Sequence, residues 1–281
     1  MADKREIDIL VLSDVHLGTQ GSEAKALLQY LQSLAPKMLI LNGDIIDIWQ
    51  FRKGFFPQAH WAVLRHFMNL AEAGVPVYYL TGNHDDSLRR LTPFRLGNIH
   101  LQDKLLLELD GKKAWFFHGD AYDPSVHKGR FWAKIGGQFY DWSIMLNRGI
   151  NRLLKPFGIP PSQFSKRLKA SVKAAVQKMN DFEQKAIELG IEKGYDYVVC
   201  GHVHRPQHRE IVTAAGQITY LNSGDWMEHR SALEYVDKVW QLYHYNAEEY
   251  EGAACLDGVE NCLEDLLRNI QDGTSDSFYR L

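Results

Sequence analysis

Short apolar stretches alternate with amphipathic helical stretches through the first two thirds of the chain, and no other feature limits the choice of fold as strongly. The stretch from Ile7 to Leu12 predicts a strand covered on both faces. Leucines at helical spacing predict a helix from Glu23 to Leu34 that ends before Pro36. The alternation continues with strands predicted at Met38–Leu41, Val77–Leu80 and Lys113–Phe117, and with a helix at His60–Ala73.

The chain beyond residue 190 is rich in predicted strands instead. They lie at Tyr195–Cys200, Arg209–Thr213, Gln217–Leu221, Ser231–Val236 and Val239–Tyr245. Strand–helix alternation followed by hairpins is typical of an α/β protein. We therefore expect two β-sheets packed face to face, with helices on the outside.

Residues 125–190 interrupt this pattern and predict a helical insertion. Its first helical stretch, Phe131–Leu154, is apolar on nearly every side, and its second runs from about Ser162 to Leu189. Between Ser125 and Asn180 there are eleven Lys or Arg and one acid, a local net charge of +10. Since the whole chain has a net charge of −3, the remainder carries −13. Such segregation points to an anionic partner or a solvated helix face.

We expect residues 1–246 to form one domain, with the insertion lying over it as a lid, and residues 247–281 to form an acidic C-terminal tail. The apolar runs are far shorter than the roughly 20 residues that a membrane-spanning helix needs. Charges in the first eight residues argue against a secretory signal. Three cysteines without a close pairing motif fit a reducing compartment, which favours the cytoplasm.

Five polar fragments each follow a predicted strand, where the loops of an α/β sheet build ligand sites. They are Asp14-Val15-His16, Gly43-Asp44-Ile45-Ile46-Asp47, Gly82-Asn83-His84-Asp85, His118-Gly119-Asp120 and Gly201-His202-Val203-His204. Together they supply seven metal donors: Asp14, His16, Asp44, Asn83, His118, His202 and His204. Carboxylates, imidazoles and an amide suit Mn²⁺, Fe²⁺ or Zn²⁺. Seven donors exceed the needs of one ion with an open position, and they favour two ions about 3.5–4 Å apart that share a carboxylate.

The five fragments, in this order, resemble the motifs of the calcineurin-like metallophosphoesterases between Asp14 and His204. The resemblance implies a four-layer αββα sandwich of two mixed sheets and hydrolysis by a metal-bridging hydroxide. It assigns Asp14, His16, Asp44 and His204 to one ion, and Asp44, Asn83, His118 and His202 to the other, with Asp44 as the bridge. His84 is then the histidine that donates a proton to the substrate phosphate or the leaving oxygen.

Within that family the chain is most similar to the UDP-2,3-diacylglucosamine diphosphatases of lipid A synthesis. The similarity lies in His118-Gly119-Asp120, in Gly201-His202-Val203-His204-Arg205-Pro206 and in the insertion between them. It implies cleavage of a UDP-linked diacyl sugar to UMP and a lipid monophosphate, typically with Mn²⁺. The chain departs from the best-known members at His84, where they have arginine, so the substrate stays open.

Two other classes compete with this interpretation: a phosphodiesterase or nuclease on the same scaffold, and a protein-binding scaffold without activity. The insertion separates the first two, because its apolar helix predicts a lipid slot better than a nucleic-acid groove. We expect Phe139 and Trp142 to line that slot and Lys166, Lys169 and Lys173 to approach the phosphates. A cytoplasmic enzyme acting peripherally at the inner membrane surface fits this pattern; the oligomeric state stays open.

Overall fold

The computed structural model describes residues 4–51, 55–122 and 181–250. Contacts divide the chain into two units, Met1–Tyr245 and Asn246–Leu281. Within the second unit the described residues contain a short 3₁₀ helix, η4 (Ala247–Tyr250). All further elements belong to the first unit.

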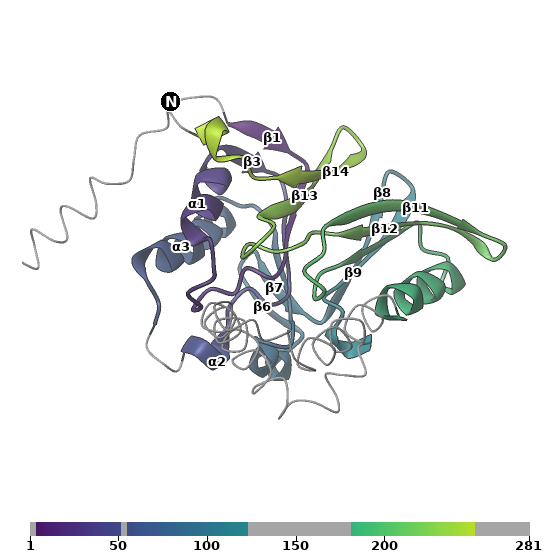
Figure 1. The fold of residues 1–281 in the computed structure, drawn as a ribbon, viewed down its shortest axis with the longest axis horizontal. Helices are drawn as coiled ribbons and strands as arrows, with labels where there is room; N and C mark the ends of the chain where they lie inside the picture. Colours follow the sequence, from purple (N-terminus) through teal and green to yellow (C-terminus); the bar gives the residue numbers. More distant parts are fainter. Residues whose placement is uncertain (1–3, 52–54, 123–180, 251–281) are drawn as a thin grey trace, which may run out of the picture. The chain divides into compact units, whose positions relative to one another are not determined.

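A seven-stranded mixed sheet forms the larger layer of the first unit (Figure 1). Its strands are, in spatial order, β14 (Val239–His244), β13 (Ser231–Val236), β2 (Ile9–Leu12), β4 (Leu39–Asn42), β5 (Val77–Leu80), β7 (Ile99–Gln102) and β6 (Phe94–Leu96). The central strands β2, β4, β5 and β7 are parallel, with Leu10 paired to Leu39 and Leu39 to Val77. The outer pairs β13–β14 and β6–β7 are antiparallel hairpins.

A five-stranded mixed sheet lies against the first one. Its order is β11 (Gln207–Thr213), β12 (Gly216–Asn222), β10 (Tyr197–Cys200), β9 (Lys112–Phe117) and β8 (Lys104–Leu109). Buried side chains of both sheets form the core between them, including Val11 and Ile40 from one sheet and Phe116 and Val199 from the other. Because these side chains alternate with others pointing outward, each sheet needs a second cover on its outer face.

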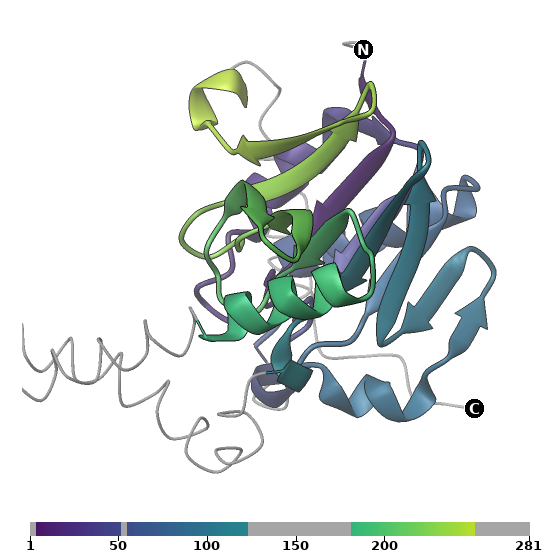
Figure 2. The same cartoon turned by 90° about the vertical axis from the view of Figure 1, so that its right-hand side faces the viewer.

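Helices supply those covers (Figures 1 and 2). The helices α1 (Ala24–Gln32) and α3 (Gln58–Glu72) pack together on the outside of the seven-stranded sheet. The helix formed by residues 181–192 packs Phe182 and Ile187 on the outside of the five-stranded sheet. This arrangement confirms the predicted α/β class with two mixed sheets packed face to face.

The predicted strand from Ile7 to Leu12 is divided in the structure. The chain bends at Asp8, so β1 (Arg5–Ile7) pairs with β3 (Leu34–Pro36) in a separate two-stranded sheet. The partly exposed carboxylate of Asp8 pairs with Lys37 instead of entering the sheet core. The first predicted helix accordingly ends at Gln32, because Leu34 already belongs to β3.

The carboxyl ends of β4, β9 and β10 meet at one end of the sandwich. The ring Nδ1 of His118, which follows β9, lies 2.9 Å from the carbonyl oxygen of Asn42 at the end of β4. The amide of Gly201, which follows β10, donates to the carbonyl of His118. Loops from both sheets therefore converge here. Two short helices flank this end, α2 (Ile48–Phe51) and the 3₁₀ helix η1 (Asp86–Leu91).

Candidate metal centre

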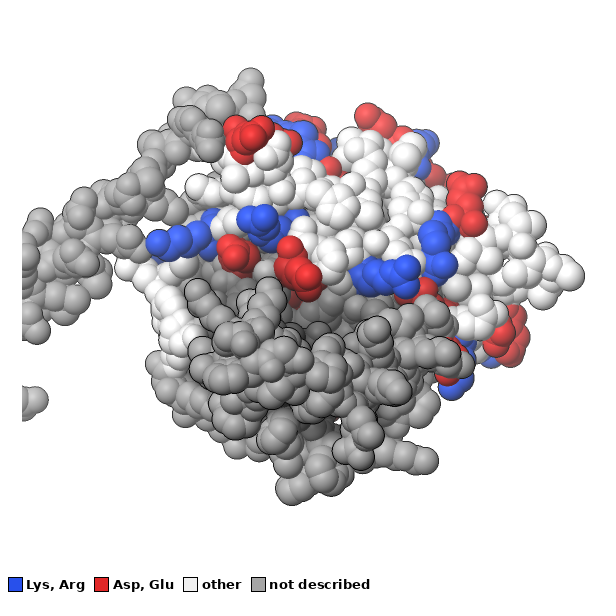
Figure 3. Space-filling view, in the orientation of Figure 1, with Lys and Arg blue, Asp and Glu red and all other residues white. Residues whose placement is uncertain are grey.

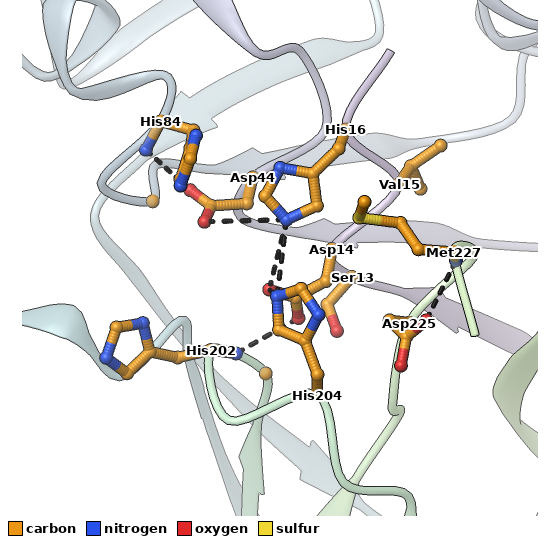
Figure 4. A network of polar contacts seen from close by, with 12 residues as sticks. Ser13, Asp14, Val15, His16, Asp44, His84, His202, His204, Asp225 and Met227 are labelled. Atoms are coloured by element: carbon orange, nitrogen blue, oxygen red, sulfur yellow. Dashed lines mark hydrogen bonds and ion pairs between the residues drawn. The ribbon is translucent and has the colours of Figure 1, made fainter. Parts of the chain in front are cut away.

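The loops after β2, β4, β5, β9 and β10 carry the seven predicted donors. Figure 4 shows Asp14, His16, Asp44, His202 and His204 close together at one end of the sandwich. Five of the seven hold a left-handed backbone with φ between 51° and 69°: Asp14, His16, Asp44, His202 and His204. This conformation costs a residue with a side chain about 1–2 kcal/mol. These residues lie in the loops after β2, β4 and β10, so three of the five donor loops hold this conformation at some expense of folding free energy.

Two buried carboxylates lie at the middle of the cluster. Asp14 Oδ1 is 3.1 Å from His204 Nε2, and Asp44 Oδ2 is 3.3 Å from His118 Nε2. His16 stands between them, with its Nε2 3.9 Å from Asp14 Oδ1 and 4.0 Å from Asp44 Oδ2. Figure 4 shows these side chains pointing toward one another.

Three groups of side chains bring potential ligand atoms within 4.8 Å of one another. They are Asp14, His16 and His204; Asp14, Asp44 and His118; and His16, Asp44 and His84. The first group belongs to one proposed ion, and the second connects the two, because it combines Asp14 of the first ion with Asp44 and with His118 of the second. Asp14, His16 and Asp44 each take part in two groups, which places them at the middle of the cluster. His202 is outside these groups, although its ring centroid is 5.3 Å from that of His118.

The residues present fit divalent cations. Asn83 Oδ1 is buried and accepts no hydrogen bond from the residues that the structure describes. Within the same part of the chain, buried Asp14 Oδ1 and His118 Nε2 have ionic neighbours but no hydrogen bond. Buried polar atoms normally find a partner, and a cation would supply one to all three. The oxygen and nitrogen donors suit borderline metals such as Mn²⁺, Fe²⁺ or Zn²⁺.

The electrostatics of the cluster point the same way. Burial alone raises the pKa of Asp14, but the imidazoles of His204 and His118 outweigh it and lower that pKa to about 2. Burial alone lowers the pKa of His204, but the Asp14 carboxylate outweighs it and raises that pKa to about 9. The pKa of His118 is likewise raised well above its usual value, by Asp44 and Asp14 against the effect of burial. The two carboxylates therefore stay ionised and need positive charge beside them.

Metal binding is expected to release protons from His118 and His204. With raised pKa values both rings hold a second proton at pH 7, whereas a cation binds the neutral ring. The apparent affinity for Mn²⁺ should therefore increase as the pH rises from 7 toward 9. Isothermal titration calorimetry in two buffers of different ionisation enthalpy measures the protons released.

A binding heat that is independent of the buffer would contradict this expectation. His16→Gln is the matched control, because burial lowers the pKa of His16 to about 4 and that ring has no second proton to lose. The variant should bind Mn²⁺ more weakly and release the same number of protons.

His84 lies beside the cluster and is held by a carboxylate of its own. Its Nδ1 is 3.0 Å from Asp47 Oδ2, and its amide donates to Asp44 Oδ1 over 2.8 Å. Burial alone lowers the pKa of His84, but the hydrogen bond to Asp47 and the charge of Asp44 outweigh it and raise that pKa. The centroid of the His84 ring lies 4.6 Å from that of His16 and 4.7 Å from that of Trp49. Asp47 was part of a recognised fragment, yet its contact with His84 is visible only in the structure.

Other carboxylates position the loops. The buried Asp85 accepts hydrogen bonds from the Tyr79 hydroxyl over 2.7 Å and from the amides of Ile45 and Gly82 over 3.1 and 2.6 Å, which joins the β4 and β5 loops. Burial and the nearby Asp44 raise the pKa of Asp85 to about 6.

The loop of His118 is secured in a similar way. Its Nδ1 donates to the carbonyl of Asn42, which leaves Nε2 facing Asp44. Two residues further on, the buried Asp120 accepts hydrogen bonds of 3.0 Å from both terminal nitrogens of Arg89. Nothing in the spacing of the sequence pointed to Arg89 as the partner.

Two glycines allow this crowding. A Cβ on Gly82 would overlap the backbone and carboxylate of Asp44. Gly119 has φ +131°, and a Cβ there would lie 2.6 Å from the ring of Phe182 and 3.2 Å from His202. Phe182, at 1% exposure, therefore packs into the notch beside two of the donor loops.

The predicted substrate contacts cannot be placed. Phe139, Trp142, Lys166, Lys169 and Lys173 lie outside the described residues, as do the two helices predicted from Phe131 to Leu154 and for most of Ser162–Leu189.

Comparison with known proteins gives a consistent result. Residues 7–206 match the family described as calcineurin-like phosphoesterase. A UDP-2,3-diacylglucosamine hydrolase of Aliivibrio fischeri is 27% identical over 240 residues, which cover 84% of this chain and 97% of that protein. The hydrolase of the same name from Bordetella pertussis is 29% identical over 212 residues, or 73% of this chain and 80% of its own. A solved dimetal phosphatase from Danio rerio has a TM-score of 0.41 at 14% identity, covering 85% of this chain and 98% of that one.

Proposed function

The chain belongs to the calcineurin-like phosphoesterase family, and on that premise we propose that it hydrolyses the diphosphate of a UDP-linked diacylated glucosamine to UMP and a lipid monophosphate. The observation that carries the proposal is the convergence of Asp14, His16, Asp44, His118 and His204 on one buried cluster. Relatives named for this substrate align with most of the chain and support the choice.

We assign the metal-holding roles to the seven donors as the family motifs order them. Asp14, His16, Asp44 and His204 would hold one ion, and Asp44, Asn83, His118 and His202 the other. Bound divalent ions would supply charge stabilisation for a phosphoryl group and lower the pKa of a water molecule. Mn²⁺ is the proposed metal, and the donor set also suits Fe²⁺ or Zn²⁺.

His84 is the proposed proton donor. Because the Asp47 carboxylate only accepts hydrogen bonds, the proton between the two groups lies on Nδ1 of His84. This leaves Nε2 to give a proton to the leaving oxygen or to hold a phosphate oxygen. The side chain is 28% exposed, so a substrate reaches it while its partner Asp47 stays buried.

A nucleic-acid substrate is the alternative, and the described residues on the face shown in Figure 3 support it less. In Figure 3, lysines and arginines of the described face stand in small groups beside acidic residues. A groove for single-stranded nucleic acid would combine a continuous basic track with exposed aromatic rings. The basic residues of the insertion between residues 123 and 180 are not among the described residues and stay part of the test below.

The proposed enzyme would work in the cytoplasm, associated peripherally with the membrane that contains its lipid substrate. Among the residues that the structure describes, no helix has the length and apolar character to cross a bilayer. The predicted apolar insertion helix is the proposed contact with lipid.

The deciding experiment is release of UMP from UDP-2,3-diacylglucosamine by the full chain in Mn²⁺. We expect turnover that chelation abolishes and added Mn²⁺ restores. Cleavage of single-stranded oligonucleotides without UMP release would favour the nuclease alternative. Hydrolysis of neither substrate, together with hydrolysis of a chromogenic phosphodiester, would mean a phosphodiesterase of other specificity.

The insertion provides a second test, which rests on sequence alone. Trp142→Ala and Phe139→Ala should lower kcat/KM for the lipid substrate much more than for a small chromogenic phosphodiester, because each buried methylene of an acyl chain contributes about 0.8 kcal/mol. Replacing a lysine by alanine, in Lys166→Ala, Lys169→Ala or Lys173→Ala, should weaken binding of the lipid substrate, and the loss should shrink as the salt concentration rises. If kcat/KM fell equally for both substrates, these residues would only stabilise the fold.

A further inference from the structure

A second histidine held by a carboxylate lies near the centre, and it is not among the candidate ligands. His229 Nδ1 is 2.5 Å from Asp225 Oδ2, the relation that also joins His84 to Asp47. Since an ionised carboxylate only accepts hydrogen bonds, this contact places a proton on Nδ1 and leaves Nε2 for a ligand. The His229 side chain is 39% exposed, whereas that of Asp225 is completely buried.

The turn that carries this pair is fixed to the candidate centre. The amide of Trp226 donates to the carbonyl of Asp14 over 3.1 Å. Asp225 Oδ1 accepts hydrogen bonds from the three following amides, those of Met227, Glu228 and His229. The amide of Ser231 donates to the carbonyl of Asp225, which closes the turn. Because hydrogen bonds hold this turn at both ends, its backbone fixes the position of His229.

Asp225 lies on the side of the cluster opposite His84. Figure 4 shows Asp225 beyond His204, with His84 across His16 from it. The carboxylate of Asp225 is close enough to His204 to contribute to the raised pKa of that ring. Asp225, which holds His229 at Nδ1, and His84, which Asp47 holds in the same way, therefore lie on two sides of the candidate ligands.

We propose that the Asp225–His229 pair binds the second phosphoryl group of a diphosphate substrate and so favours diphosphates over simple phosphodiesters. This inference rests on the proposed function and adds a specificity residue to it. A diphosphate diester has two anionic phosphoryl groups, and the cluster with His84 accounts for the one that is cleaved. The other needs a hydrogen-bond donor at its edge, and a ring N–H of histidine makes a charge-assisted hydrogen bond to an ionised phosphate oxygen.

The test compares two substrates on the Mn²⁺-loaded full chain. We expect His229→Ala to lower kcat/KM for UDP-2,3-diacylglucosamine by about 10- to 100-fold, the usual worth of a hydrogen bond to a charged group. The value for bis-p-nitrophenyl phosphate, which has a single phosphoryl group, should change less than about twofold. His208→Ala is the matched control, because His208 is an exposed histidine of the same region in β11.

Asp225→Asn separates positioning from folding, because asparagine keeps the acceptor for the three amides and removes the charge beside Nδ1. The Asp225→Asn variant should show the same fall in kcat/KM for the diphosphate substrate as His229→Ala, with little change in melting temperature. Equal losses on both substrates, or no loss on either, would overturn the inference.

Inhibition constants distinguish a wrong diphosphate subsite from a wrong proposed function. At fixed free Mn²⁺, with the chromogenic substrate, His229→Ala should weaken inhibition by inorganic pyrophosphate and leave inhibition by orthophosphate unchanged. If the wild-type chain releases no UMP yet shows this difference, the proposed substrate is wrong and the diphosphate subsite stands. If the two inhibitors respond alike, the subsite is wrong, whatever the substrate.

Discussion

Asp44→Ala should lose its bound metal and its activity together. Asp44 belongs to two of the three groups of potential ligands, and its Oδ2 lies 3.3 Å from His118 Nε2 and 4.0 Å from His16 Nε2. Removing a carboxylate shared by two dications would leave their repulsion uncompensated. We expect less than about one equivalent of Mn²⁺ after gel filtration, and turnover at background level.

Metal analysis and circular dichroism on the same sample make this result interpretable. Glu234→Ala is the matched control, because Glu234 is a buried carboxylate of the same sheet that contacts Arg5 and Tyr30 instead of the cluster. That variant should lose stability and retain metal. Two equivalents of bound ion and normal turnover in Asp44→Ala would refute the bridging role.

His84→Ala is expected to keep its metal and lose turnover by about 10²- to 10⁴-fold, the usual contribution of a positioned proton donor. The ring stands beside the cluster and is held at Nδ1 by Asp47, which fits a group that acts on substrate. His84 also shares a 4.8 Å group with His16 and Asp44, so a ligand role is the competing outcome. Measured kcat together with bound metal separates the two.

Three variants sharpen this test. Loss of one metal equivalent in His84→Ala would make His84 a ligand, and unchanged kcat would remove it from the mechanism. Asp47→Asn should lower kcat less than His84→Ala does, because it only loosens the orientation of the ring. His84→Arg should retain activity on the diacyl substrate if this chain is functionally akin to the diphosphatases that have arginine at this position.

The sequence by itself determined the parts of this protein that depend on local pattern. The predicted strands Val77–Leu80 and Ser231–Val236 match β5 and β13 to the residue, because strands covered on both faces are mostly apolar, with the buried Glu234 as the exception in β13. The donors were found for the same reason, because each one follows such a strand and strand ends are where loops build sites. The bend at Asp8 was missed, since one polar residue within an apolar stretch does not reveal which of two sheets the chain joins.

Only the tertiary structure decided how residues far apart in the sequence support one another. The pairing of Arg89 with Asp120 depends on how two loops from different sheets meet. The left-handed backbone of Asp14 and of Asp44 is imposed by the packing around the cluster, against the preference of those residues. The pairing of Asp225 with His229 is local, whereas the place of this turn beside the donors depends on the hydrogen bond from the Trp226 amide to the Asp14 carbonyl, which are far apart in the sequence. Such contacts depend on how the sheets pack, and the periodicity of a sequence does not predict which loops that packing brings together.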